Sequence, residues 1–256
     1  MFINNYCIII ILCDNWAIAV HNGKYCGKKN LNDYKIEVTE YNGICEIDPE
    51  LLVKDVDSTC FTFDEATGTI TGYDSSCGDS IRIPSQINGI TVSKIGDEAF
   101  HTNRLEKLYL PDSITSMGEW VFAENQITEL KLPNNIQSME SCIFERNFIK
   151  EINIPASLKV IPDHSFGCNK LTKITFNEGL EEIESNAFWN YYTNEIVLPS
   201  SLKRLNTLAF HWGETKKVII KGKDSSADFE YYGSMYNPIF GWADGYDDSN
   251  IIYEGK

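Results

Sequence analysis

The sequence predicts a solenoid, an array of short parallel strands with a 22-residue period between an N-terminal and a C-terminal cap. Two regularities predict it. Leu-Pro or Ile-Pro pairs recur every 22 residues, with Phe176-Asn177 in the fourth place. A phenylalanine stands eleven residues after the second member of each pair, at Phe122, Phe144, Phe166, Phe188 and Phe210. A unit this short buries its apolar side only by stacking on its neighbours.

Each unit also contains the spacing L-x-x-L-x-L, first met at Leu105, Leu108 and Leu110. This spacing, at this period, is the signature of a leucine-rich repeat, and its last residues alternate as a strand does. Asparagines recur 22 residues apart just after the phenylalanine, at Asn103, Asn125, Asn147 and Asn169. We expect their amides to satisfy backbone groups at a turn. An earlier copy carries five extra residues, with a turn at Asn88-Gly89.

These patterns divide the chain into four parts. Residues 1–20 are an apolar leader, 21–77 a cysteine-bearing N-terminal cap, 78–220 the leucine-rich-repeat solenoid and 221–256 a C-terminal cap. The leader is too short to span a bilayer and is interrupted by Asp14, so it is either the remnant of a membrane anchor or a cap on the solenoid. In the C-terminal cap we expect a short helix from Ser225 through Tyr232 and a last strand at residues 250–253.

Six of the eight cysteines precede Gly78. Cys60 and Cys77 bracket a predicted hairpin, with strands at residues 61–63 and 69–73, and we expect them to form a disulfide. Cys26 and Cys45 form the next plausible pair. Such a cluster is typical of an oxidising compartment, although reduced thiols in a cytoplasmic protein remain the alternative.

The chain is strongly acidic, with 22 Lys and Arg against 37 Asp and Glu and a formal charge of −15. This charge repels nucleic acid, which we exclude as a partner. The four histidines lack zinc-site spacing with the cysteines, so no metal or other cofactor is expected.

One stretch holds the residue types of a hydrolase site, namely Asp163, His164, Ser165 and Cys168. In an extended segment His164 would point away from both neighbours, and a triad needs side chains that converge. The same positions hold Glu119, Trp120 and Val121 in another copy. We therefore predict turn residues and no enzyme.

The segments LPDSITSMGEWVFAENQI and IPASLKVIPDHSFGCNKL resemble the repeats of BspA-like leucine-rich-repeat surface proteins, over residues 78–220. CFTFDEATGTITGYDSSC is similar to the entry module of such proteins. The stretch from Val20 to Pro49 is similar to the link between a pilin-like membrane helix and the repeats. The resemblance implies a cell-surface or extracellular location, a non-enzymatic binding or adhesion role, and membrane anchoring through an N-terminal segment that is missing or a remnant.

The outward strand positions are the candidate binding residues, because alternate side chains of a strand face opposite ways. One row contains Arg82, Tyr109, Lys131, Asn153 and Thr175, and continues to Val197 and Ile219. A second row, two residues earlier, contains Ser80, Lys107, Glu129, Glu151, Lys173, Glu195 and Lys217. Mixed character of this kind suits a protein or glycan surface. An ordinary solvated strand face, on a structural spacer within a longer surface protein, is the alternative.

Overall fold

The computed structural model describes residues 8–12, 16–21, 24–30, 56–213, 215–225, 228, 230–233 and 251–255. The chain divides into two compact units, Met1–Asp55 and Val56–Lys256. The first unit contains an antiparallel sheet of β1 (Ile8–Leu12), β2 (Trp16–His21) and β3 (Lys24–Asn30). Two of its strands lie in the stretch that the sequence suggests as a leader.

No helix within the described ranges is long and apolar enough to cross a membrane. The expected pair of Cys26 and Cys45 falls outside the described residues, because Cys45 is not among them and only the backbone of Cys26 is described.

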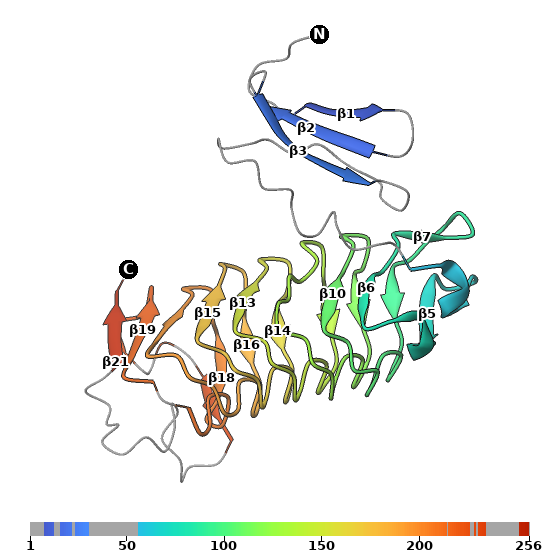
Figure 1. Ribbon diagram of the computed structural model, residues 1–256. Helices are drawn as coiled ribbons and strands as arrows, with labels where there is room; N and C mark the ends of the chain where they lie inside the picture. Colours follow the sequence, from blue (N-terminus) through green and yellow to red (C-terminus); the bar gives the residue numbers. More distant parts are fainter. Residues whose placement is uncertain are drawn as a thin grey trace. The chain divides into compact units, whose positions relative to one another are not determined.

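The second unit is a stack of coils, seen from the side in Figure 1, and it confirms the predicted solenoid. One series of parallel strands falls at the expected repeat positions. It comprises β6 (Ser80–Arg82), β10 (Lys107–Tyr109), β13 (Glu151–Ile154), β15 (Lys173–Phe176), β17 (Glu195–Leu198), β19 (Lys217–Lys221) and β21 (Ile251–Glu254). β13 pairs with β15 and β17 with β19 in register 22 residues apart, as Ile152 does with Ile174. The offset is 27 residues between β6 and β10, where the first copy carries its five extra residues, and 33 between β19 and β21.

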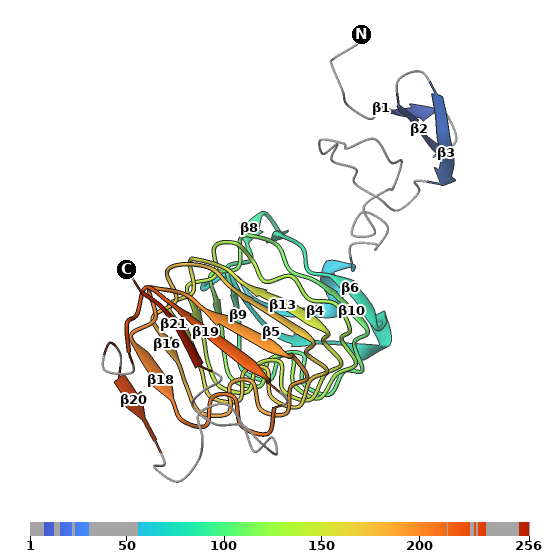
Figure 2. The same cartoon turned by 90° about the vertical axis from the view of Figure 1, so that its left-hand side faces the viewer.

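A second parallel series, which the sequence analysis did not predict, runs along another side of the stack (Figure 2). From β11 to β18 each strand contains the apolar residue six positions after the proline position of its repeat, and this residue is buried, as at Met117 and Ile161. The series comprises β9 (Lys94–Ile95), β11 (Ser116–Met117), β12 (Ser138–Met139), β14 (Val160–Ile161), β16 (Glu182–Ile183), β18 (Arg204–Asn206) and β20 (Glu230–Tyr232).

The N-terminal end of the stack is closed by the predicted hairpin. β4 (Phe61–Asp64) pairs antiparallel with β5 (Thr69–Tyr73), and β5 pairs parallel with β9. Two 3-10 turns, η2 (Ser58–Cys60) and η3 (Ser75–Cys77), flank the hairpin. The expected turn at Asn88-Gly89 joins β7 (Gln86–Ile87) to β8 (Ile90–Thr91), and both turn residues have positive φ, as a two-residue hairpin requires.

The core is a ladder of stacked phenylalanines, one from each coil. Phe122, Phe144, Phe166 and Phe188 are fully buried, and neighbouring rings lie 5.3, 5.7 and 5.6 Å apart and almost parallel. Tyr73 of the hairpin stacks on Phe100 at the N-terminal end. These recurring phenylalanines thus fill the space between the coils.

The asparagine ladder is confirmed at positions 125, 147 and 169, whereas the half-buried Asn103 donates to His101 O (3.2 Å) within its own turn. Asn147 Oδ1 accepts a hydrogen bond from Ile127 N (3.0 Å), and Asn147 Nδ2 donates to Phe122 O (2.9 Å) and to Phe144 O (3.2 Å). Asn125 and Asn169 make the equivalent bonds in their own coils. Each amide therefore satisfies buried backbone groups that the turn leaves without strand partners.

At the C-terminal end, residues 230–232 do not form the expected helix. They form β20, which pairs parallel with β18 and places Glu230 N 2.8 Å from Lys203 O. Residues 226, 227 and 229 lie outside the described ranges. The expected last strand is present as β21, and both strands extend the two parallel series, because an exposed ladder of backbone groups favours another strand.

Candidate recognition surface

The candidate binding row lies on the first strand series. Lys131, Asn153 and Thr175 are exposed, whereas Arg82 and Tyr109 are half-buried, with the Arg82 guanidinium carbon 5.0 Å from the centre of the Tyr109 ring. Asn153 pairs with Thr175, and Arg82 with Tyr109, in adjacent strands. The structure thus brings these residues together in pairs.

The predicted continuous strand ribbon is wrong at Lys131, because residues 129–132 form no strand. The coils separate slightly at this point. Lys150 N lies 3.4 Å from Thr128 O, compared with 2.8 Å for the equivalent bond from Thr172 N to Lys150 O. The first series is therefore divided into the pairs β6–β10 and β13–β15 and the triplet β17–β19–β21.

The later part of the second outward row forms ion pairs between neighbouring coils. Lys173 Nζ lies 3.6 Å from Glu151 Oε2, and Lys217 Nζ lies 2.9 Å from Glu195 Oε2. On the other strand series, Lys203 pairs with Glu181 in the same way. These charges stabilise each other to a small extent and are already partnered.

The hydrolase-like residues lie in the turn between the second strand series and the phenylalanine. His164 has a φ of 54°, and its Nδ1 lies 2.9 Å from Asp163 Oδ2. The expectation that the two side chains point apart was wrong, because the segment is a left-handed turn and not an extended strand. Ser165, however, is fully buried and donates its hydroxyl hydrogen to the backbone oxygen of Pro162 at 2.8 Å, and not to a catalytic base.

The two free thiols of the described region are poor nucleophiles. Burial, with the nearby carboxylates of Glu145 and Asp163, raises the pKa of Cys142 to about 12. Burial also raises the pKa of Cys168. Because the thiolate is the reactive form, both side chains are in the unreactive protonated form at neutral pH.

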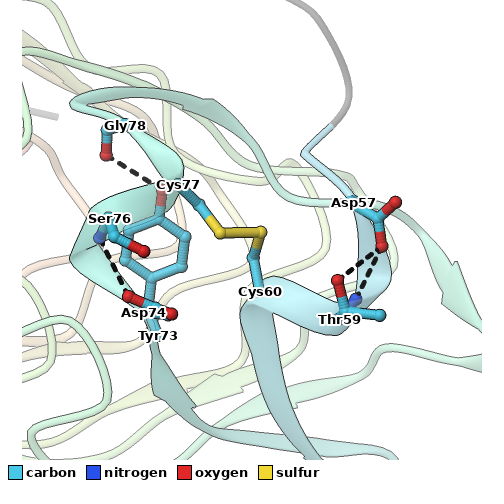
Figure 3. The surroundings of a disulfide bond; sticks show 8 residues. All are labelled: Asp57, Thr59, Cys60, Tyr73, Asp74, Ser76, Cys77 and Gly78. Atoms are coloured by element: carbon cyan, nitrogen blue, oxygen red, sulfur yellow. Dashed lines mark hydrogen bonds between the residues drawn. A yellow bond between two sulfur atoms is a disulfide. The ribbon is translucent and has the colours of Figure 1, made fainter.

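The cysteine pair expected at the N-terminal end is present as a disulfide, with Cα atoms of Cys60 and Cys77 6.1 Å apart (Figure 3). The Tyr73 hydroxyl donates to Gly78 O at 2.9 Å beside it. Burial, together with Asp74 and Asp79, raises the pKa of Tyr73 to about 12. The disulfide links the two ends of the β4–β5 hairpin, which closes the N-terminal end of the stack.

Sequence reasoning missed a set of exposed aromatic side chains on the turn edge. Phe148, Tyr192 and Trp212 are 47, 38 and 61% exposed. A signal was available, since Phe148 and Tyr192 directly follow the asparagine position of their repeats, where Gln126 and Lys170 stand in other copies. An apolar residue at a repeat position that is polar in other copies is expected to have its side chain exposed to solvent.

Comparison with known proteins agrees with this architecture. Residues 93–216 match a family described as "BspA type Leucine rich repeat region", in six copies. A leucine-rich-repeat protein from T. pallidum is similar in structure, with a TM-score of 0.53 and 23% identity over 66% of this chain and 87% of that one. No curated protein matches the sequence.

A leucine-rich cell surface protein from Faecalibacterium prausnitzii is also similar, with a TM-score of 0.50 and 22% identity. The match covers 69% of this chain and 55% of that chain. At these identities the two solved structures show the fold alone, and the family match carries the assignment. The six stacked repeats of residues 93–216 therefore belong to the BspA-type leucine-rich-repeat family.

Proposed function

We propose that this chain is a cell-surface or secreted recognition and adhesion module that binds protein or glycan partners without catalysing a reaction. The observation that carries the proposal is the regular stack of coils, which repeats the same outward positions at every step and so presents an extended surface. The F. prausnitzii protein of the same fold is described as a cell surface protein. A disulfide at the end of the stack suits an oxidising location.

Two features support the choice of partner class. The net charge of −15 disfavours nucleic acid. The outward positions carry polar, charged and aromatic side chains in series, which suits a large partner lying across several coils. Anchoring of the chain to a membrane through its N-terminal part belongs to the same proposal.

A structural spacer within a longer surface protein is the second candidate. The observation that favours it is the row of ion pairs from Glu151–Lys173 to Glu195–Lys217, in which the charges of one strand face are partnered within the chain. A spacer needs only a soluble, stable face, whereas a binder needs groups that remain available.

The test is saturable binding of the full chain to a panel of purified extracellular-matrix proteins and immobilised glycans. We expect at least one partner to bind, and folded protein that binds none of them would favour the spacer. For the candidate row, the combined replacement of Tyr109, Lys131 and Asn153 by alanine should weaken that binding. Lys203→Ala, on the other strand series, is the matched control. Unchanged affinity of the triple variant would move the contact away from the row.

A further inference from the structure

Three exposed aromatic residues lie on one edge of the solenoid, next to the repeat position of the buried asparagines, which Phe148 and Tyr192 follow and Trp212 precedes. Among the described residues, Phe148, Tyr192 and Trp212 are three of the four large hydrophobic side chains with high exposure. Single apolar side chains are ordinary on a protein surface, but a grouped set indicates an interaction site. We call the set of Phe148, Lys150, Lys170, Tyr192, Trp212 and Lys216 the aromatic edge.

Backbone hydrogen bonds establish that Phe148, Lys170 and Tyr192 are aligned. Phe148 N donates to Ile127 O, Lys170 N to Ile149 O and Tyr192 N to Leu171 O, so the three donors occupy the same position in consecutive coils. Asn190 N donates to His211 O, so Trp212 lies one coil beyond Asn190, two residues before the repeat position of Phe148 and Tyr192. With neighbouring strands about 4.8 Å apart, Phe148 and Tyr192 stand roughly 10 Å apart along the stack.

Lysines stand between and beside these rings. Lys170 lies between Phe148 and Tyr192, with its Nζ 5.5 Å from the centre of the Tyr192 ring. Lys150 and Lys216 are exposed two residues further along their coils. An aromatic face beside an ammonium group can bind an apolar surface and an anion at the same time.

These lysines differ from those of the strand faces. Lys173, Lys203 and Lys217 each form an ion pair with a glutamate of the preceding coil. Lys150, Lys170 and Lys216 form no salt bridge with any residue in the described part of the chain. A locally basic edge on a protein of charge −15 therefore keeps its positive charge available to a ligand.

The aligned positions also contain few acids. The position of Phe148 holds Gln126, Lys170 and Tyr192 in the neighbouring coils, and Glu214 follows outside the described residues. The position of Lys150 holds Thr128, Thr172, Asn194 and Lys216, and Glu106 stands there two coils earlier. The charge along this edge is thus complementary to an anionic ligand, whereas the chain as a whole repels one.

From this alignment we propose that the aromatic edge binds a linear anionic polysaccharide, with Phe148, Tyr192 and Trp212 against the faces of sugar rings and the lysines against carboxylate or sulfate groups. The roughly 10 Å between Phe148 and Tyr192 is comparable to the length of a disaccharide unit in an extended chain. An acidic peptide fits less well, because a peptide that adds as a strand needs free backbone groups, and the amides of Phe148, Lys170 and Tyr192 are already bonded to the preceding coil.

This inference rests on the proposed recognition function and names one ligand class for it. The test measures binding of the full chain to hyaluronan and chondroitin sulfate oligosaccharides by calorimetry, with neutral dextran and poly-L-glutamate as comparison polymers. We expect saturable binding to an anionic polysaccharide that weakens as salt increases. Dextran and poly-L-glutamate should bind much more weakly, since each lacks one of the two required features.

The double change Phe148→Ala and Tyr192→Ala should weaken binding about tenfold, because both ring contacts are lost. Lys170→Gln should weaken it severalfold and reduce its dependence on salt. Lys173→Gln removes a lysine that is already paired with Glu151, so it is the matched control and should leave the affinity unchanged. All four side chains are exposed, so the variants should fold, and circular dichroism verifies this.

Absence of binding to both anionic polysaccharides would overturn the inference, as would equal binding of poly-L-glutamate or equal affinity of the edge variants and the parent. If the chain fails these measurements but binds another member of the protein and glycan panel, the recognition function stands and only the aromatic edge is rejected. If it binds neither the polysaccharides nor any member of the panel, the recognition function and the aromatic edge as its binding site are both rejected.

Discussion

At the scale of single residues, the turn around each phenylalanine depends on side chains that accept an unfavourable backbone. Thirteen described residues other than glycine have positive φ, and most recur at two fixed positions of the repeat. Cys142 and His164 share the first position, and Arg146 and Cys168 the second. The left-handed conformation is costly for any residue with a Cβ, so the stacked neighbours must impose it. This accounts for the unrelated residue types found there.

Thr102 allows a direct measurement of this cost. It is exposed, β-branched and has a φ of 58°, an uncommon combination. Thr102→Gly should raise the free energy of unfolding by up to about 1 kcal/mol, because the relieved strain exceeds the extra entropy of the unfolded glycine. Thr128→Gly, at an exposed position outside the positive-φ set, should instead lower it by about 0.5–1 kcal/mol. Urea titration compares the two, and a loss in Thr102→Gly as large as in Thr128→Gly would contradict the strain argument.

Asn147 tests the asparagine ladder. Asn147→Ala leaves Ile127 N buried without its partner, whereas Phe122 O keeps the hydrogen bond from the asparagine amide of its own coil (3.0 Å). A buried donor without a partner costs about 1–3 kcal/mol, so we expect a loss of roughly 1–3 kcal/mol in the free energy of unfolding. Asn135→Ala is the matched control, since Asn135 is exposed and donates only to Asp112 O. Similar denaturation midpoints for the two variants would show that the ladder amides are dispensable.

At the scale of elements, each coil is a unit whose faces fit only its neighbours. A residue that differs from the repeat pattern in one coil must therefore be accommodated by a compensating residue in the next coil. The ladder position holds Tyr191 and then Gly213 near the C-terminal end. Tyr191 is 1% exposed, and its hydroxyl accepts a hydrogen bond from Thr215 Oγ1 at 2.6 Å. A Cβ on Gly213 would lie 1.8 Å from the Tyr191 ring, so the glycine provides the space that the tyrosine fills.

This pairing predicts a strong interaction between two substitutions. Gly213→Ala should lower the free energy of unfolding by about 1–3 kcal/mol or more, because the methyl group overlaps the ring. In a Tyr191→Asn background the same change should cost far less, since the ring is gone. A double-mutant cycle by thermal or urea unfolding measures the coupling, which should exceed about 1 kcal/mol. Additive effects would show that the coils relax independently.

At the scale of the whole molecule, stability is a sum of coil and interface contributions, so the ends are the weakest places. The Cys60–Cys77 disulfide stabilises the hairpin that covers the first end, and a loop of this size contributes about 3 kcal/mol in the chain-entropy model. At the other end, β21 pairs with β19 and covers the last coil.

Loss of this disulfide should therefore act locally. In the Cys60→Ser, Cys77→Ser variant, amide hydrogen exchange should accelerate in β4, β5 and β9, while β13 and β15 remain protected as in the parent. Hydrogen-exchange mass spectrometry measures this along the chain. Cys142→Ser, which removes a free thiol in the middle of the stack, is the control. Uniform acceleration along the array would mean that the solenoid unfolds as one cooperative unit.

The sequence by itself determined the period, the phenylalanine and asparagine ladders, the first strand series and the N-terminal hairpin. These depend on positions that recur every 22 residues, and stacking forces equivalent residues into equivalent places. The asparagines at 125, 147 and 169 could be assigned because a buried amide has a fixed set of donors and acceptors.

Only the tertiary structure decided the second strand series, the break at Lys131, the strand at Glu230–Tyr232 and the exposure of the aromatic edge. The second strands are two or three residues long and show no alternating pattern of their own, so only pairing with the adjacent coil creates them. Which lysines are partnered, such as Lys173, and which remain available, such as Lys170, depends equally on the side chain one coil away. These contacts join residues of different coils, so they exist only after the coils have stacked.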